Sequence, residues 1–317
     1  MSVYTSVGRD ELTVWLQPLG LGELIDHAGI AAGMQNSNYF VTTTQGRFVL
    51  TLFERIETST LDFYLALQDH LASRGIPCPQ PLADPQGRRW RRLAGQPAAL
   101  LSCLPGVAEE APTPAHCHAL GEMLARLHLA GAGMANPLPN PCGAAWRQAI
   151  GAALLPVLSP EERALLADEL AFQAAQDFTA LPRGIIHADL FRDNVLWDDS
   201  PPRVLPAGHA RLSGVLDFYF AGEDCLLFDL AVAANDWCFN GATLAALIAG
   251  YQGRRLLSAA EMAVWPAMQR AAALRFWLLR LEVRHRPRGG EVVTIKDPEY
   301  FRQILQRLRL APEPLPR

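Results

Sequence analysis

The feature that most constrains this chain of 317 residues is a set of polar residues between short apolar runs in residues 184–219. His187 and Asp189 follow an apolar pair, and Asn194 opens a second apolar run five residues after Asp189. Asp217 ends a third apolar run and precedes a phenylalanine. Short apolar runs bounded by polar residues are typical of buried strands. We therefore expect these polar side chains at the ends of neighbouring strands.

The order His-x-Asp, then Asn, then Asp-Phe is the order that phosphoryl transfer uses on a kinase-type scaffold. A carboxylate such as Asp189 can orient a hydroxyl by accepting its proton, and Mg²⁺ on ATP phosphates needs hard oxygen ligands. Asn194 and Asp217 supply such oxygens. An isolated pattern of this kind is more often a capped turn. The ordered presence of all four residues, His187 included, favours the phosphoryl-transfer site.

Composition narrows the class of protein. The net charge is −4 and the sequence pI is about 6.1, which does not favour a nucleic-acid partner. Half of the residues are hydrophobic, and the length suits two domains or lobes. No apolar run approaches the ~18 residues of a membrane span, and the chain begins without an apolar signal segment. We therefore predict a soluble, cytoplasmic protein that binds neither membrane nor nucleic acid.

The first hundred residues read as strands with two helices. The pattern predicts helices over 6–19 and 59–73, the second with Ser59 as N-cap, and strands over 24–30, 39–43, 47–53 and 98–104. The small polar turn at 31–38 can fold over phosphate groups with its N–H groups pointing inward. We place the boundary between two lobes after the last strand, which gives lobes 1–103 and 104–317.

The rest of the chain reads as mostly helical. Thr113 before a proline and the capping box opened by Ser159 mark two helix starts. Further helices are predicted from residue 225 and over 241–251, 258–285 and 298–309. The predicted class is α+β, with an antiparallel sheet in the first lobe and helices in the second.

Together these residues resemble the aminoglycoside phosphotransferase-like family of small-molecule kinases. The family's later D-L-A motif is matched by Asp229-Leu230-Ala231. Protein kinases usually carry Arg between the His and Asp and Gly after the Asp-Phe, whereas this chain has Ala188 and Tyr219. The resemblance implies a two-lobed, protein-kinase-like fold and a metabolite as phosphate acceptor.

A closer resemblance, to the bacterial homoserine kinases of this fold, covers nearly the whole chain. It is carried by segments 33–40, 45–54, 187–196, 228–238, 274–281 and 296–301. It implies transfer of the ATP γ-phosphate, with Mg²⁺, to the side-chain hydroxyl of L-homoserine on the route to threonine.

The resemblance also implies roles for residues of the motif. Asp189 is expected to be the base that orients the hydroxyl, and Asn194 and Asp217 the Mg²⁺ ligands. Asp229 is expected to anchor the catalytic loop through its backbone, with His187 in a structural role. Arg192, inside the loop, could steady the transferring phosphoryl group.

Nucleotide contacts are expected in the first lobe. The candidates are Gln35, Asn36, Ser37 and Asn38 for the phosphates and the backbone from Ser102 to Leu104 for the adenine. Kinases of this scaffold carry a lysine on the third strand, but Thr51 stands at that position and Lys296 is the only lysine in the chain. An arginine such as Arg47 or Arg55, or Mg²⁺ with backbone groups, would have to serve the phosphates instead.

An amino-acid substrate needs a cation for its carboxylate and an anion or carbonyl for its ammonium. The candidates are Arg275 and Arg280 for the carboxylate, and Asp224, Asn235 and Asp236 for the ammonium. An ordinary ion pair between packed helices is the alternative explanation for each.

Two other functions stay open. One is a kinase of another hydroxylated metabolite, such as an aminoglycoside, choline or an amino alcohol, although the Arg-rich final forty residues do not suit a polycationic aminoglycoside. The other is a silent nucleotide-binding regulatory protein, which the absent third-strand lysine suggests and the retained Asp189, Asn194 and Asp217 oppose. We expect a monomer or a homodimer.

Overall fold

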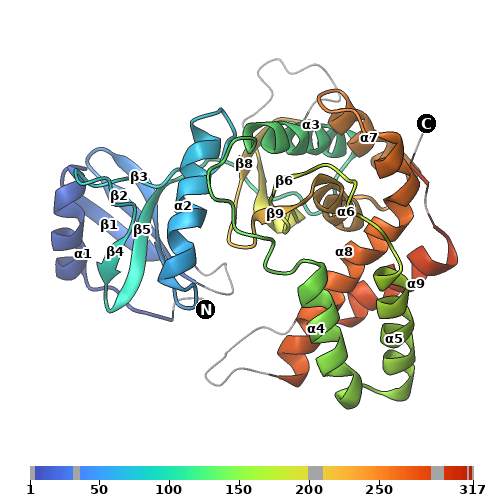
Figure 1. The fold of residues 1–317 in the computed structure, drawn as a ribbon. Helices are drawn as coiled ribbons and strands as arrows, with labels where there is room; N and C mark the ends of the chain where they lie inside the picture. Colours follow the sequence, from blue (N-terminus) through green and yellow to red (C-terminus); the bar gives the residue numbers. More distant parts are fainter. Residues whose placement is uncertain (1–3, 31–35, 199–209, 287–295, 313, 316–317) are drawn as a thin grey trace. The chain divides into compact units, whose positions relative to one another are not determined.

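The computed structural model describes residues 4–30, 36–198, 210–286, 296–312 and 314–315. The chain divides into two compact units, Met1–Pro105 and Gly106–Arg317. Each unit has its own sheet or sheets and its own helices (Figure 1).

The N-terminal unit is built on an antiparallel sheet with the strand order β1-β2-β3-β5-β4. In the view of Figure 1 this sheet lies between the helices α1 and α2. The elements are α1 (Arg9–Leu16), the 3₁₀ turn η1 (Gln17–Leu19), β1 (Leu24–Gly29), β2 (Ser37–Thr43), β3 (Gly46–Leu52), α2 (Thr58–Ala72), β4 (Arg91–Leu93) and β5 (Gln96–Ser102).

One face of this sheet forms an apolar core. Tyr39 on β2 lies opposite Leu50 on β3, and both are buried because directly opposed residues share a face. Along β2 buried and half-buried residues alternate with the period of two, whereas β5 is buried without interruption over residues 97–101. Helix α1 contributes Leu12, Trp15 and Leu16 to the same cluster.

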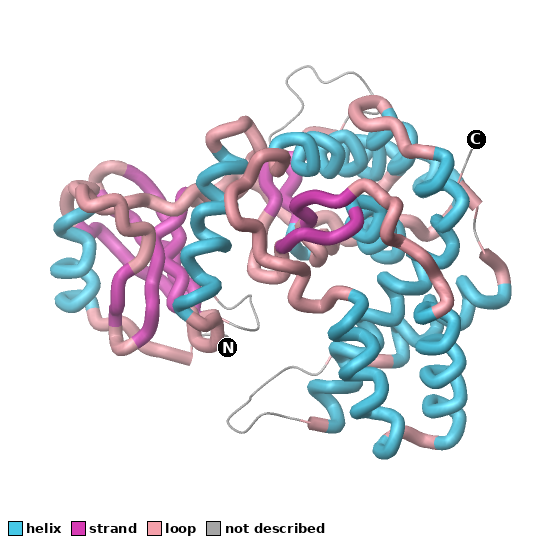
Figure 2. Tube along the Cα trace, viewed as in Figure 1, coloured by secondary structure: helices cyan, strands magenta, loops and turns pink. Residues whose placement is uncertain are grey.

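The C-terminal unit is mostly helical and contains two short two-stranded sheets (Figure 2). One sheet pairs β6 with β9 and the other pairs β7 with β8. The elements are α3 (Pro114–Ala130), α4 (Ala144–Leu154), η2 (Leu155–Val157), α5 (Pro160–Ala174), β6 (Arg183–Ile186), η3 (Arg192–Asn194), β7 (Val195–Trp197), β8 (Leu212–Val215), β9 (Gly222–Cys225), α6 (Leu226–Trp237), α7 (Gly241–Gln252), α8 (Ala259–His285) and α9 (Glu299–Leu310).

The predicted α+β class is confirmed, and two of the three predicted caps are present. Thr113 accepts the N–H of His116 at the start of α3, and Ser159 forms its capping box with Glu162 at the start of α5. The prediction for Ser59 was wrong, because α2 already begins at Thr58. No helix among the described residues is long and apolar enough to cross a membrane.

Two glycines allow α3 and α7 to approach closely. A Cβ at Gly121 of α3 would collide with the backbone carbonyl of Leu247, and one at Gly250 of α7 would collide with that of His118. Because both obstacles are backbone atoms, neither can rotate away. The two helices therefore depend on residues without a side chain at this crossing.

We expect Gly121→Ala to destabilise the C-terminal unit by about 1–3 kcal/mol, because the added methyl group forces two helix backbones apart. This outcome opposes helix propensity, which favours alanine over glycine by about 1 kcal/mol in a helix interior. The measurement is the free energy of unfolding in denaturant. Gly241→Ala is the matched control, since a Cβ there meets nothing within 4 Å. Equal stability of the two variants would contradict the role of the close crossing.

Candidate active site

Strand pairing and side-chain hydrogen bonds in the C-terminal unit bring the predicted catalytic residues together. Asp189 follows β6, Asn194 immediately precedes β7, and Asp217 follows β8. The pairing of β7 with β8 places Asn194 beside Asp217, because the Leu216 N–H donates to the Asn194 carbonyl over 2.8 Å. The Asn194 side-chain amide donates to the Asp189 carbonyl (2.8 Å) and to its carboxylate (3.3 Å).

Asp229, on the fully buried helix α6, fixes the backbone of the catalytic loop. Its carboxylate accepts the N–H of His187 over 2.7 Å and the N–H of Ala188 over 2.8 Å. Ala188 has a φ of +64°, a conformation that costs an L-residue about 1–2 kcal/mol. Hydrogen bonds from the backbone N–H groups to a charged acceptor offset that strain.

The protonation state of Asp229 follows from the same contacts. Burial acts to raise its pKa, but the hydrogen bonds from the His128 side chain and from the His187 backbone hold the pKa below its usual range. His128 reaches the carboxylate through Nε2 (3.1 Å) and the Tyr251 hydroxyl through Nδ1 (2.7 Å). Asp229 is therefore ionised and fully hydrogen-bonded in the core.

His187 ties the two halves of the motif together. Its Nδ1 accepts the Asp189 N–H over 3.2 Å, so its proton lies on Nε2, which donates to the Leu216 carbonyl over 2.8 Å. Burial lowers the pKa of His187, which keeps the ring neutral. The ring thus links the backbone of Asp189 to the residue that precedes Asp217.

Arg275 of α8 contacts the predicted base. Its Nη1 donates to the Asp189 carboxylate over 3.2 Å, and the guanidinium stacks against the rings of Phe220 and Phe276. The Arg275 side chain is completely buried. Its Nε and Nη2 have no hydrogen-bond partner in the described structure. Buried N–H groups of a cation normally have partners, so the Arg275 guanidinium is only partly satisfied in the core.

The surroundings of Asp217 suit a divalent cation. Burial, and then the charge of Asp189, raise the pKa of Asp217 to about 7. A cation beside it would stabilise the ionised form, and the Asn194 amide, whose nitrogen faces Asp189, leaves its oxygen for the same ligand sphere. In the described part of the chain, no group of three or more His, Cys, Asp or Glu side chains is arranged to hold a metal ion. Of the predicted ligands, the Asp217 carboxylate and the Asn194 amide oxygen would hold the ion.

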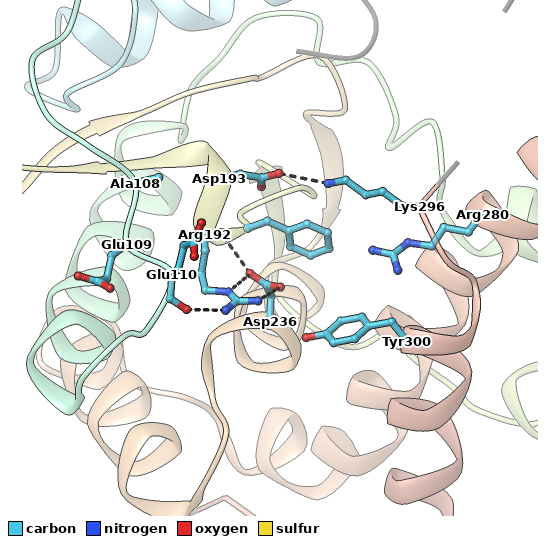
Figure 3. Close-up of a pocket in the computed structure, with 10 residues that line it drawn as sticks. Ala108, Glu109, Glu110, Arg192, Asp193, Asp236, Arg280, Lys296 and Tyr300 are labelled. Atoms are coloured by element: carbon cyan, nitrogen blue, oxygen red, sulfur yellow. Dashed lines mark hydrogen bonds and ion pairs between the residues drawn. The ribbon is translucent and has the colours of Figure 1, made fainter. Parts of the chain in front are cut away.

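A pocket of about 500 Å³ lies next to the catalytic loop within the C-terminal unit (Figure 3). Asp236 on its floor accepts the backbone N–H of Arg192 (2.9 Å) and also pairs with its guanidinium. Arg192 further donates to the Glu110 carbonyl over 2.7 Å. The lining residues are Ala108, Glu109, Glu110, Phe191, Arg192, Asp193, Asp236, Arg280, Lys296 and Tyr300.

The predicted substrate residues are thus divided among different places. Asp236 and Arg280 line the pocket, and Arg275 contacts Asp189. Asn235 donates to the Gln269 carbonyl in the core. Asp224 accepts from the Asn140 amide and pairs with Arg183 beside a separate cavity of about 240 Å³.

The predicted nucleotide residues lie in the N-terminal unit, except that Gln35 falls outside the described residues. Thr51 donates to the Asn38 side chain over 2.8 Å, across the register of β2 and β3. The Ser37 hydroxyl accepts the N–H groups of residues 4 and 5 and donates to Glu54. Asn36 is buried.

The end of β5 carries the predicted adenine contacts. Ser102 exchanges hydrogen bonds with Gln80, whose N–H donates to the serine hydroxyl and whose carbonyl accepts the serine N–H. Leu104 lies half-buried in the loop that follows.

Sequence reasoning missed five charged or polar residues of the pocket beside the catalytic loop. They are Glu109, Glu110, Asp193, Lys296 and Tyr300. Only Lys296 carried a visible sign, because it is the single lysine among 28 lysines and arginines. The others look like ordinary surface residues until the fold brings them together.

Comparison with known proteins identifies the class. A model described as "Phosphotransferase enzyme family" matches residues 26–270. The solved structure of a spectinomycin phosphotransferase in complex with ADP and spectinomycin shares the fold, with a TM-score of 0.67 at 11% identity, over 96% of this chain and 98% of that one. An amicoumacin kinase shares it with a TM-score of 0.64 at 14% identity, over 95% and 92%. The chain belongs to the phosphotransferase enzyme family.

Closer relatives are homoserine kinases. The chain is 46% identical over 312 residues to the homoserine kinase of Methylobacillus flagellatus, with 96% of this chain and 95% of the relative covered. It is 47% identical over 322 residues to that of Polaromonas naphthalenivorans, with 98% of each covered. These relatives confirm the predicted resemblance to homoserine kinases and the small-molecule kinase class.

We expect Asp229→Asn to lose about 3–5 kcal/mol of stability at pH 7, because an amide cannot accept at every position that the buried carboxylate serves. Because the folded pKa of Asp229 lies below the unfolded value of 3.8, its ionisation stabilises the fold above that value. That contribution is lost as the pH falls through the folded pKa. The stability difference between the two proteins should therefore narrow below about pH 4.

The check is denaturant unfolding of both proteins between pH 7 and about pH 3. Asp26→Asn, which changes an exposed strand residue, is the control and should unfold like the unaltered protein. A difference that stays constant with pH would show that the Asp229 charge does not stabilise the loop.

Proposed function

We propose that this protein is a homoserine kinase that transfers the γ-phosphate of ATP to the side-chain hydroxyl of L-homoserine. The observation that carries the proposal is the similarity to homoserine kinases over nearly the full length, at 44–47% identity. The convergence of Asp189, Asn194 and Asp217 supports it, because phosphoryl transfer needs a base and oxygen ligands at one place.

Asp189 is the base in this proposal. Its two carboxylate oxygens receive hydrogen bonds from Arg275 and from the Asn194 amide, which fix the direction of the remaining lone pairs. The substrate oxygen attacks the γ-phosphorus while the bond from that phosphorus to the β–γ bridging oxygen breaks and ADP leaves. The hydroxyl proton passes to Asp189.

Asn194 and Asp217 fit the role of Mg²⁺ ligands. When bound, the ion would neutralise charge on the phosphate oxygens. The protein's own contribution is to hold an amide oxygen and a carboxylate on adjacent strand ends, with Leu216 hydrogen-bonded to Asn194 between them. His187 maintains this spacing through its bond to the Leu216 carbonyl.

The N-terminal unit supplies the nucleotide contacts in this proposal. The residues concerned are Gln35, Asn36, Ser37, Asn38 and Thr51 for the phosphates and the backbone from Ser102 to Leu104 for the adenine. Thr51 is buried and donates to Asn38, which accounts for a threonine at the position where related scaffolds carry lysine. The amide N–H of Ser102 is already bonded to Gln80, which leaves Leu104 as the better candidate for the adenine.

The pocket beside the catalytic loop is the proposed acceptor site. It contains both signs of charge, which suits an amino acid with an ammonium and a carboxylate. Asp236 and Glu110 are proposed for the ammonium, and Arg280 for the carboxylate. Arg192 is engaged by Asp236 and Glu110, which favours a role in building the pocket over direct contact with the phosphoryl group.

The deciding measurement is ADP release from Mg·ATP in the presence of L-homoserine. L-Serine, L-threonine, choline and kanamycin are each tested separately as alternative acceptors. We expect turnover with homoserine, and we expect Asp189→Asn to lower kcat on the order of 10²–10⁴-fold because the base is removed. Asp10→Asn, at the exposed start of α1, is the control and should keep full activity.

Turnover with a different acceptor would retain the kinase and reject homoserine as the substrate. ATP binding without turnover of any acceptor would instead favour a silent nucleotide-binding protein. Full activity of Asp189→Asn would remove Asp189 from the mechanism.

A further inference from the structure

Lys296 occupies a position that the proposed mechanism does not use. It is the only lysine of the chain, and it lines the pocket beside the catalytic loop. Its Nζ lies 3.1 Å from a carboxylate oxygen of Asp193, which is itself part of that loop. A lone lysine at the acceptor pocket of an Arg-rich protein calls for a chemical explanation.

The charges of the pocket are separated in space. Arg192 and Asp236 neutralise each other, and Lys296 pairs with Asp193. Figure 3 shows Arg280, Lys296 and Tyr300 on one side of the pocket and Glu109 and Glu110 on the other. A ligand with a negative and a positive end therefore finds cations on the first side and acids on the second.

Arg280 has unused capacity to bind an anion. It donates one hydrogen bond to the Asp297 carbonyl and stacks on Phe301 at 4.5 Å. Among the described residues it has no carboxylate partner, although it is partly withdrawn from solvent. Burial lowers its pKa, and the nearby charges of Tyr300 and Asp236 act in the opposite direction.

Lys296 can join Arg280 without abandoning its own partner. An ammonium has three N–H donors, and within the described residues one of them is used, by Asp193. The Lys296 and Asp193 side chains are 40% and 63% exposed, so their ion pair contributes about 0–1 kcal/mol and opposes rearrangement little. A flexible four-carbon stem lets the ammonium turn toward a ligand.

We propose that Lys296, together with Arg280, binds the carboxylate of the phosphate acceptor and makes the enzyme selective for amino acids over amino alcohols. The proposal rests on the proposed function, since it assigns the acceptor to this pocket. Lys296 is then a specificity-determining residue. It holds the substrate by the end remote from the reacting hydroxyl.

The test compares L-homoserine with L-homoserinamide, which keeps the hydroxyl and the ammonium but replaces the carboxylate with a neutral amide. We expect the unaltered enzyme to prefer homoserine in kcat/KM by roughly 10–100-fold, the discrimination of a charge-assisted hydrogen bond. Lys296→Gln should remove most of that preference by raising KM for homoserine, while kcat/KM for the amide stays unchanged. Lys296→Arg should retain most of the preference, because the charge remains.

Arg254→Gln is the matched control, since it removes an exposed cation paired with Glu122 and lies outside the pocket. It should leave the preference unchanged. If Lys296→Gln lowers kcat/KM equally for both acceptors, Lys296 acts on the catalytic loop alone and the proposal is overturned. If it changes neither, Lys296 forms a surface ion pair only, and the proposal is again overturned.

A readout without turnover separates this proposal from the proposed function. In a protein labelled with ¹³C at lysine Cε, the single lysine gives a single side-chain signal. We expect L-homoserine to shift that signal substantially more than L-homoserinamide does. Absence of turnover with homoserine would reject the proposed function, whereas equal shifts with both ligands, or no shift, would reject the role of Lys296.

Discussion

The site depends on one buried carboxylate. Asp229 accepts two successive backbone N–H groups, from His187 and Ala188, and so holds a turn in which Ala188 has a positive φ. An alanine does not adopt that conformation freely, and the two charge-assisted hydrogen bonds supply the compensation. Because α6 carries Asp229 and is buried along its whole length, the anchor cannot move independently of the core. Because Asp229 holds the backbone of the two residues before Asp189, it also sets the position of Asp189.

Hydrogen bonds between His187 and two backbone groups extend this support from Asp229 to Asp189 and Asp217. His187 accepts the N–H of Asp189 and donates to the carbonyl of Leu216, the residue before Asp217. Asp217 also has a positive φ, of +60°. Two strained residues are therefore held by one hydrogen-bonded unit. Strain of this kind persists only where the surroundings overdetermine it, and it is frequent at functional sites.

The sequence pattern predicted Asp189, Asn194 and Asp217 as catalytic and metal-binding residues because their order is the one that phosphoryl transfer uses, and these roles stay predictions. All three lie near strand ends, the pairing of β7 with β8 puts Asn194 beside Asp217, and the Asn194 amide donates to Asp189. The caps at Thr113 and Ser159 were predictable for a similar reason, since they are local. The prediction of Ser59 as an N-cap was wrong because helix α2 begins at Thr58, with Glu57 at the N-cap position.

The residues that line the pocket were predictable only in part, because no local rule gives the direction of a side chain within the helical unit. Asn235 and Asp236 are adjacent on α6, yet Asn235 donates into the core while Asp236 faces the pocket. Asp224 has the right charge but pairs with Arg183 at another cavity. Glu110 and Tyr300 reach the pocket from distant parts of the chain, and nothing in either local sequence indicates that meeting.

The use of arginine and lysine in this chain follows their chemistry. Two arginines near the site occupy places with fixed geometry: Arg192 pairs with Asp236 through two nitrogens, and Arg275 stacks against the rings of Phe220 and Phe276. A planar guanidinium suits such places, because its donors are already arranged. The one lysine lies half-exposed at a pocket wall, paired to a single oxygen. In the proposed role, this residue pairs with the Asp193 carboxylate in the free protein and binds the carboxylate of the acceptor as well. A compact ammonium on a flexible stem suits that double role, which would account for the one lysine among arginines.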